Sequence, residues 1–298
     1  MFFAIGTALC TGLAAVLTAE IAWRVSGALI ISCWRALTAA ILLILFVWWG
    51  RHWPGMETRH LPAVIGSSLS AAVLGEFCLN KAYRELGARR AALMFATAAP
   101  FSVLVGWLFL GESPTLSALL GIALVVVGLA LAIWFTPLHE GNNDRHNEAT
   151  ASFVGVLVGL VAGLAQAIGN AMARSALTSG ADPVAVMALR AVVATLALWS
   201  VWLTVTRAGK VQRLAPSAGV LAVIGLGAFF SFALGNTLLM IALRSGEIAI
   251  VTTLAATTPV MLLPLTWWRS GRCPDVRAWL GAVLTVGGVA CIAFLHTG

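Results

Sequence analysis

Residues 91–134 read AALMFATAAPFSVLVGWLFLGESPTLSALLGIALVVVGLALAIW. Two apolar runs flank the short hinge Gly111-Glu112-Ser113-Pro114. Each run has about 20 residues, which is long enough for a helix to cross a hydrocarbon core of about 30 Å. Pro100 lies inside the first run, and Gly121 and Gly128 form a G-x6-G pattern in the second, on a face that a neighbouring helix can approach closely. The stretch predicts two membrane-spanning helices joined by a tight turn.

The same pattern returns in the second half of the chain. Residues 246–294 read GEIAIVTTLAATTPVMLLPLTWWRSGRCPDVRAWLGAVLTVGGVACIAF. Pro259 repeats Pro100 at an offset of 159, and Pro274, Gly281 and Gly288 repeat Pro114, Gly121 and Gly128 at an offset of 160. Further pairs are Arg35 with Arg190, at an offset of 155, and Gly75-Glu76 with Gly235-Asn236, at the offset of 160. The chain is therefore a tandem duplication.

The composition excludes a water-soluble protein. Hydrophobic residues make up 60% of the chain and charged residues 10%, and the mean hydropathy is +0.97. These values are typical of a polytopic α-helical membrane protein. The net charge of +7 comes from basic residues in the short connections, where they orient the chain and contact anionic lipid, so we expect lipid as a partner and no nucleic acid.

Ten apolar runs of spanning length follow one another along the chain. They lie near residues 2–23, 28–49, 61–83, 91–110, 115–135, 152–173, 183–206, 217–241, 248–268 and 277–296. An odd number of helices in each half forces the second half to enter the membrane from the opposite side. We therefore expect an all-α membrane protein of ten transmembrane helices, arranged as two inverted five-helix repeats around a central cavity. The first repeat is expected over 1–137, a polar linker over 138–150 and the second repeat over 151–298.

The duplicated set of motifs resembles the drug/metabolite transporter superfamily, and within it the EamA-type carriers with ten helices. The mid-helix proline, the GESP hinge and the G-x6-G helix carry this resemblance, which covers essentially the whole chain. It implies a secondary transporter in the inner (plasma) membrane. The chain length fits the bacterial amino-acid exporters of the superfamily, which implies export. One departure is that Glu112 in the first hinge has no carboxylate counterpart in Ser270-Gly271-Arg272 of the second.

The orientation of the chain is predicted differently by two criteria. Basic residues are more numerous in the connections that follow odd-numbered helices, and the positive-inside rule then places both termini outside. The resemblance instead implies that both termini are cytoplasmic. Both alternatives stay open at this point.

Polar side chains inside apolar helices are candidates for the substrate cavity, because such groups are costly to place in lipid. Glu76, Asn80 and Tyr83 recur at helical spacing in the third run, and Glu76 is a candidate for contact with substrate or with a coupling proton. A structural hydrogen bond to a neighbouring helix is the alternative for Glu76. Gln166 and Asn170 share a face of the sixth run, where they line the cavity or join helices.

The two repeated prolines indicate a second part of the same cavity. Each one removes a backbone donor inside an apolar run, and a free carbonyl survives in lipid only where protein or water satisfies it. Pro100 and Pro259 are thus candidate helix kinks, with a simple packing kink as the alternative. The hydroxyls of Thr97 and Thr257 lie beside them. The predicted cavity set comprises Glu76, Asn80, Gln166, Asn170, Asn236, Thr97 and Thr257.

A transporter accounts for these features better than the other classes of membrane protein. All five histidines lie in connections or at the C-terminal end, and no Walker motif is present, so we expect no enzyme, no metal, no cofactor and no direct use of ATP. A lone-carboxylate intramembrane enzyme is a remote alternative, and too few charges line the helices for the selectivity ring of a channel. Few charges with several amides and hydroxyls favour amino acids, including aromatic ones, over phosphorylated sugars. Facilitated movement or export of other small neutral metabolites or drugs is the alternative, and a monomer is expected to suffice.

Overall fold

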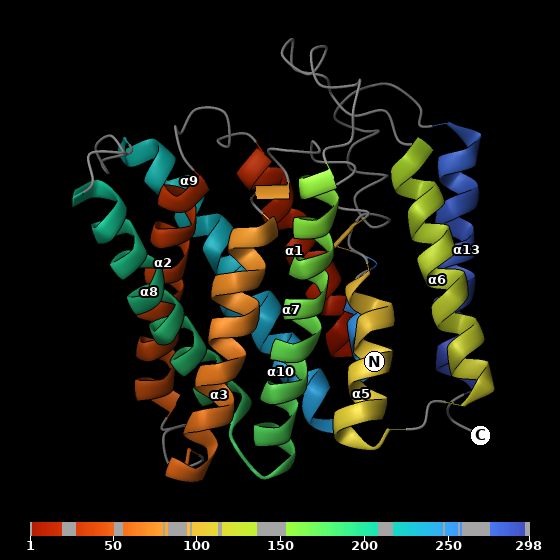
Figure 1. Cartoon of the computed structure of the whole chain (residues 1–298), viewed down its shortest axis with the longest axis horizontal. Coiled ribbons are helices and arrows are strands. Elements are labelled where there is room, and N and C mark those ends of the chain that lie inside the picture. Colours follow the sequence, from red (N-terminus) through yellow and green to blue (C-terminus); the bar gives the residue numbers. More distant parts are fainter. Residues whose placement is uncertain are drawn as a thin grey trace.

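The computed structural model is all-helical over the residues that it describes. These residues are 2–19, 28–50, 56–79, 81–82, 94–95, 97–112, 115–135, 153–207, 217–246, 248–255, 257 and 275–295. The helices stand side by side as a bundle of roughly parallel rods (Figure 1).

Each predicted apolar run corresponds to one rod of the bundle. The first half contains α1 (Phe2–Ala19), α2 (Ala28–Gly50), a rod made of η2 (Thr58–His60), α3 (Leu61–Ser67) and η3 (Ser68–Gly75), then α5 (Ala98–Leu110) and α6 (Leu116–Phe135). The second half contains α7 (Phe153–Thr178), α8 (Pro183–Arg207), a rod made of α9 (Ala218–Ala228), η5 (Phe229–Gly235) and α10 (Asn236–Ser245), then α11 (Ile248–Ala255) and α13 (Val276–Leu295).

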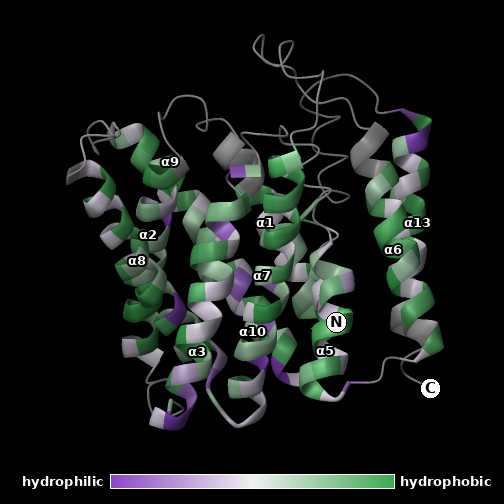
Figure 2. Cartoon of the chain, viewed as in Figure 1, coloured by the Kyte–Doolittle hydropathy of each residue, from purple (hydrophilic) through white to green (hydrophobic). Residues whose placement is uncertain are grey.

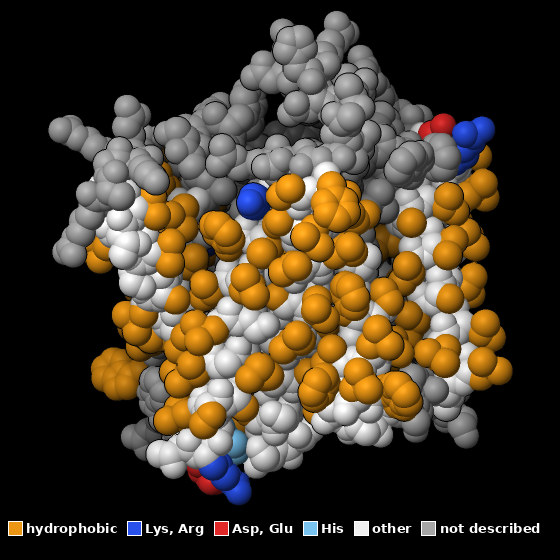
Figure 3. All heavy atoms as spheres, in the orientation of Figure 1, with side chains coloured by type: hydrophobic (Ala, Val, Ile, Leu, Met, Phe, Trp, Pro, Cys, Tyr) orange, Lys and Arg blue, Asp and Glu red, His pale blue; other side chains and the backbone are white. Residues whose placement is uncertain are grey.

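The length and surface of the rods suit a bilayer. Five described segments are long and apolar enough to span one: Leu29–Gly50, Thr58–Leu79, Phe153–Thr178, Pro183–Thr206 and Ala218–Ser245. Shorter apolar helices accompany them. Hydrophobic side chains cover the middle of the face shown in Figure 3, and the charged side chains drawn there lie towards the two ends. In Figure 2 hydrophobic segments make up most of the helices, with hydrophilic segments at the two ends and a few within the bundle. The chain is thus built as a multi-pass membrane protein.

Both long composite rods contain a π-helical segment at the same place in their repeat. The segment η3 ends at Gly75 and η5 ends at Gly235, which are repeat equivalents. The next residues are Glu76 and Asn236, so the two polar positions that the sequence pairs also share a local backbone. Single π-helical turns are rare and occur frequently at functional sites.

The contact between α6 and α13 shows that the two repeats are inverted. The helices are antiparallel and lie together at one edge of the bundle (Figure 1). A Cβ atom added to Gly128 would lie 2.6 Å from the carbonyl oxygen of Gly281, and one added to Gly288 would lie 2.7 Å from that of Gly121. Since Gly281 and Gly288 are the repeat equivalents of Gly121 and Gly128, the contact is reciprocal. Only a twofold axis perpendicular to these helices, and hence in the membrane plane, produces it.

The two repeats interlock, and neither forms a bundle alone. Helix α7 of the second repeat packs against α3, η3 and α5 of the first, while α1 of the first packs against α9, η5, α10 and α11 of the second. Helices α2 and α8 pack against each other as repeat equivalents. Trp199 of α8 lies edge-on to Trp34, with ring centroids 5.9 Å apart, and its indole N–H donates to the carbonyl oxygen of Cys33 at 3.4 Å. The interior of the bundle is therefore shared between the repeats.

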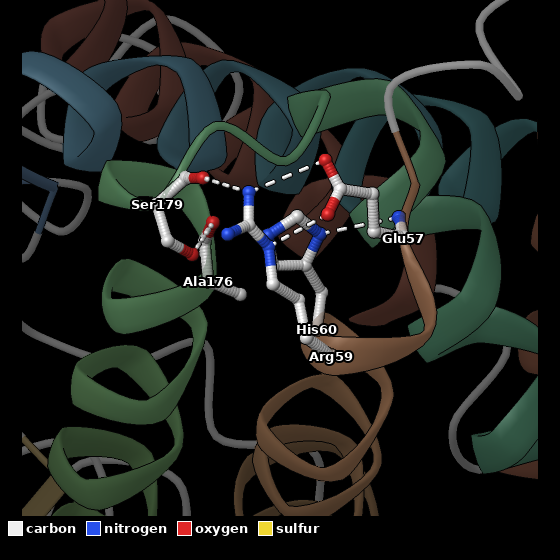
Figure 4. Close-up of polar contacts among 5 residues, drawn as sticks. All are labelled: Glu57, Arg59, His60, Ala176 and Ser179. Atoms are coloured by element: carbon white, nitrogen blue, oxygen red, sulfur yellow. Dashed lines mark hydrogen bonds and ion pairs between the residues drawn. The ribbon is translucent and has the colours of Figure 1, made fainter.

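A capped turn joins α7 to α8 and meets the start of the third rod. Gly180 adopts a left-handed conformation (φ 107°), and the carboxylate of Asp182 accepts the backbone N–H groups of Val184 and Ala185 at 2.9 and 3.0 Å. The guanidinium of Arg59 bridges the Glu57 carboxylate, at 2.8 Å, and the carbonyl oxygen of Ser179, at 3.4 Å (Figure 4). This contact places both connections at the same end of the bundle.

Candidate functional site

Helix α7 is the central helix of the candidate site because its glycines allow other segments to pack closely against it. A Cβ atom on Gly159 would lie 2.6 Å from the Cβ of Met94, and one on Gly163 would lie 2.8 Å from the hydroxyl oxygen of Thr97. Gly155, Gly159 and Gly163 follow one another at every fourth residue, a spacing that predicts close helix contact, and the structure confirms such contact at Gly159 and Gly163. The structure thereby brings Thr97 onto α7, one turn before Gln166.

The amides of α7 lie on a face that the third rod covers with serines. The side-chain amide of Gln166 donates to the side-chain oxygen of Asn170 at 3.5 Å, and Asn170 is buried. The hydroxyl of Ser67 donates to the carbonyl oxygen of Gly169 at 2.6 Å, and that of Ser70 donates to the carbonyl oxygen of Ala165 at 2.7 Å. The two rods are thus joined by serine hydroxyls beside the two amides, and the assignment of the amides to the cavity stays a prediction.

Thr97 and Thr257 make the same local turn in the two repeats. The hydroxyl of Thr97 donates to the carbonyl oxygen of Met94 at 2.5 Å, and that of Thr257 donates to the carbonyl oxygen of Leu254 at 2.7 Å. The backbone N–H groups repeat these contacts at 3.2 and 3.3 Å. Because the threonines and their acceptors keep the same repeat offset, the turn is a duplicated feature of the fold.

The two candidate kink prolines differ in what the structure describes. Pro100 is the third residue of α5, directly after the Thr97 turn, and its side chain is exposed. A proline in the first helical turn lacks a donor that would have no intrahelical partner in any case. Residues 94–95 before the turn are also helical, and residue 96 between them and Thr97 lies outside the described residues, so the kink at Pro100 stays a prediction. Pro259 lies outside the described residues, and so does the candidate Asn80.

Glu76 and Arg35 line the same narrow pocket. In the sequence, Arg35 was noted only as the repeat equivalent of Arg190. The pocket is lined by Ser32 and Arg35 of α2, Ala72 of η3, Glu76, Leu198 of α8 and Phe232 of η5. Arg35 Nη2 donates to the hydroxyl of Ser231 at 2.7 Å, and its guanidinium lies 5.9 Å from the centre of the Phe232 ring. The carboxylate and the guanidinium thus face one space between both repeats.

The remaining candidates lie around this space without converging on one point. A Cβ atom on Gly75 would lie 3.8 Å from the backbone nitrogen of Gln166, which places α7 beside the Glu76 segment. In the other repeat, a Cβ atom on Gly235 would lie 3.2 Å from the methyl group of Thr11 of α1. The segment that contains Asn236 therefore lies beside α1. Thr11 and Gln166 are related by the same offset as Arg35 and Arg190, so the two neighbourhoods are repeat equivalents.

A buried ion pair that the sequence did not predict closes one end of the site. The carboxylate of Glu112 pairs with the guanidinium of Arg174 and accepts the backbone N–H of Ile248, the first residue of α11, at 3.1 Å. Gly111 is left-handed (φ 66°) and turns the chain so that Glu112 lies under α11. Arg174 lies one helical turn after Asn170 on the same face of α7. This spacing is the feature of the sequence that could have indicated an inward-facing arginine.

The arrangement supports binding and movement of a small molecule. The interlocked helices place the carboxylate of Glu76, the guanidinium groups of Arg35 and Arg190, amides and hydroxyls inside an apolar bundle. A buried ion pair ties α5, α7 and α11 together at one end. Among the described residues, no three His, Cys, Asp or Glu side chains converge as metal ligands would.

Comparison with known proteins agrees with this architecture. The model of a family described as the EamA-like transporter family matches residues 1–134 and 153–294. A crystal structure described only as that of a protein is similar to this chain with a TM-score of 0.79 and 12% sequence identity, and the alignment covers 99% of this chain and 96% of the other. At this identity the likeness concerns the fold alone. No curated protein matches the chain.

Proposed function

Because the chain belongs to the EamA-like transporter family, we propose that it is a secondary carrier that exports amino acids, including aromatic ones, by alternating access. The family and the membrane-spanning helices establish a transporter of small molecules with a two-repeat fold. The amino-acid substrate, the export direction and the inner membrane as its location are the parts that we propose. A monomer, without enzymatic activity, is proposed to suffice.

One observation carries the choice of substrate. Opposite charges on Glu76 and Arg35 line the same pocket, with apolar walls from Leu198 and Phe232. A neutral sugar offers no opposite charge to either group, and a phosphorylated metabolite would be repelled by the carboxylate. A small zwitterion with an apolar side chain uses both. The resemblance to amino-acid exporters supports the direction.

Counterflow in proteoliposomes tests this proposal. Vesicles that contain the purified chain are loaded with unlabelled phenylalanine, leucine, alanine, glutamate, lysine or glucose, and the uptake of labelled phenylalanine is followed. We expect internal phenylalanine and leucine to stimulate uptake above the rate in protein-free vesicles. Glucose and glutamate should not, because neither matches the charges and walls of the pocket. Stimulation by glucose alone, or by none of the amino acids, would contradict the proposed substrate.

A further inference from the structure

Arg35 and Glu76 have opposite charges and face one pocket, but they do not neutralise each other. Both residues are described, and no ion pair joins them within the 4.0 Å that would define one. The Arg35 Nε atom is buried and has no hydrogen-bond partner. Ionisable groups inside a membrane protein normally pair with one another or with backbone carbonyls. The pocket is therefore lined by two side chains of opposite charge that do not pair with each other.

The neighbours of Arg35 hold its guanidinium in place. Ser231 accepts from Nη2 at 2.7 Å and in turn donates its hydroxyl to the carbonyl oxygen of Gly227 at 2.8 Å. The Phe232 ring supports the guanidinium at 5.9 Å, a distance typical of a cation–π contact. A guanidinium held on one side by a hydroxyl and a ring keeps its other N–H groups in a fixed direction, which suits the recognition of a planar carboxylate.

The position of Arg35 along its helix places the pocket inside the bundle. Helix α2 begins at Ala28, and Arg35 lies about two turns further on, which is about 10 Å along the helix axis. Glu76 lines the same pocket and so lies at a similar depth.

We propose that Arg35 and Glu76 form a recognition site for the two charged groups of an α-amino acid. The ligand carboxylate binds the guanidinium of Arg35, the ligand ammonium binds the carboxylate of Glu76, and the ligand side chain packs against Phe232 and Leu198. This assignment deepens the proposed function and rests on it. The pocket is closed in this conformation and has no room for a water molecule, so its walls, which come from both repeats, must separate before the ligand enters.

The repeat-equivalent position does not form a second site of this kind. Arg190 is 4% exposed, its Nη1 lies 3.3 Å from the Met240 sulfur, and its backbone carbonyl accepts the hydroxyl of Ser68. The residue that corresponds to Glu76 is Asn236, which carries no charge. At the equivalent positions the second half therefore has an arginine that could bind a ligand carboxylate, but no acidic side chain that could bind a ligand ammonium. The equivalent positions do not form a second site for a zwitterion.

Ligands that lack one charged group test the contact with Arg35 and the contact with Glu76 separately. The full chain in lipid nanodiscs is titrated with L-phenylalanine, with phenethylamine, which lacks the carboxylate, and with 3-phenylpropionate, which lacks the ammonium. We expect phenylalanine to bind at least about tenfold more tightly than either analogue, since each lost charge–charge contact is worth about a factor of ten or more.

Substitution of Arg35 or of Glu76 should affect only the ligand group that each residue binds. Arg35→Gln should weaken phenylalanine at least about tenfold while phenethylamine changes by less than about threefold, and Glu76→Gln should do the same with 3-phenylpropionate as the unaffected ligand. Arg35→Lys keeps the charge and should leave phenethylamine unchanged, which provides a second test if the Gln variant does not fold. Arg244→Gln and Glu57→Gln remove charges from exposed side chains and should leave all three affinities unchanged.

Two results would overturn the assignment. One is equal affinity of the unsubstituted chain for phenylalanine and for either analogue. The other is an equal loss of all three ligands in folded Arg35→Gln and Glu76→Gln variants, because this would show a structural role for both residues. If phenylalanine still shows counterflow in either case, the proposed function stands and the recognition site alone is wrong. If the unsubstituted chain neither binds nor exchanges any amino acid, both proposals are wrong.

Discussion

At the scale of single residues, the structure assigns different tasks to the charges inside the bundle. Arg190 is packed into the interior, Glu112 and Arg174 satisfy each other, and Arg35 and Glu76 face a pocket without pairing. A sequence identifies all of these as intramembrane charges, but it does not tell which ones meet. That depends on the rotation of each helix and on contacts between distant helices. Arg174 and Glu112 belong to different repeats, and their pairing needed the structure.

The ion pair between Glu112 and Arg174 should contribute strongly to stability. The two side chains are only 7% and 16% exposed, and removal of one partner from a buried pair typically costs about 3–5 kcal/mol because it leaves the other charge uncompensated. We expect Glu112→Ala to lower the free energy of unfolding by this amount in a denaturant titration in mixed micelles. Glu112→Gln should lose less, since its amide oxygen still accepts the N–H of Ile248.

The matched control is the exposed pair at the end of the bundle. The side chains of Glu57 and Arg59 are 58% and 64% exposed, so Glu57→Gln should cost at most about 1 kcal/mol. A double substitution of Glu112 and Arg174 by Ala should cost less than the sum of the two single substitutions. Strict additivity would show that the two side chains do not stabilise each other.

At the scale of elements, the glycines of the last helix in each repeat were informative in the sequence. Their spacing predicts a face for close packing, and the structure places that face of α6 against the same face of α13. The breaks in the helices were harder to predict. Pro100 follows the turn of Thr97 directly, but the hydroxyls of Thr97 and Thr257 make the turn in each repeat. The π-helical segments before Glu76 and Asn236 have no proline. Such segments arise from packing between helices, which apolar periodicity alone does not contain.

Two adjacent glycines of α13 provide a direct test of this packing. A Cβ atom on Gly288 would lie 2.7 Å from the carbonyl oxygen of Gly121 and 2.8 Å from the backbone nitrogen of Val125, whereas one on Gly287 would meet nothing within 4 Å. Gly288→Ala should destabilise the chain by about 1–3 kcal/mol, the usual cost of overpacking. Gly287→Ala should be neutral or stabilising by up to about 1 kcal/mol, through helix propensity.

Thermal unfolding in detergent measures the difference between these variants. We expect the midpoint of Gly288→Ala to fall below that of the unsubstituted chain and the midpoint of Gly287→Ala to stay at or above it. Equal midpoints for the two variants would mean that α6 and α13 do not approach each other as closely as described.

At the scale of the whole molecule, most of the architecture could be predicted from the sequence. The number of apolar runs, the duplication and the odd number of helices in each half together require inverted repeats, and the α6–α13 contact confirms them. The interlocking of the repeats could not be predicted in this way. The sequence shows which faces are apolar or small, but it does not show that α7 packs against the third rod of the other repeat. The candidate pocket depends on the interlocking of the repeats because its walls come from both halves.

Inverted repeats make a simple prediction for residues that are equivalent in the two halves. Glu57 and Ser217 are related by the repeat offset, both are exposed, and each is the N-cap of the first helical segment of its rod. They should lie on opposite sides of the membrane. Ser179 contacts Arg59 and should lie on the same side as Glu57. Single cysteines at these positions, in a variant without the five native cysteines, can be labelled with a maleimide that does not cross membranes.

In sealed vesicles of one orientation, we expect Glu57→Cys and Ser179→Cys to react together and Ser217→Cys to react only after the membrane is opened, or the reverse. The side on which Glu57→Cys reacts also decides between the two orientations that the sequence left open. Labelling of Glu57→Cys and Ser217→Cys from the same side would contradict the inverted arrangement.

For the proposed alternating-access carrier, the ion pair at the end of α5 predicts unequal kinetics for the two directions of movement. At the two repeat offsets, Glu112 and Arg174 correspond to Arg272 and Ala19, which cannot form a matching pair. Symmetry therefore no longer requires the inward-open and outward-open states to have the same free energy, and each difference of about 1.4 kcal/mol changes their ratio about tenfold. Without an energy source the final distribution of substrate across the membrane is unaffected. The half-saturation concentrations measured from the two sides should differ instead, so that the carrier loads more readily from one side than from the other.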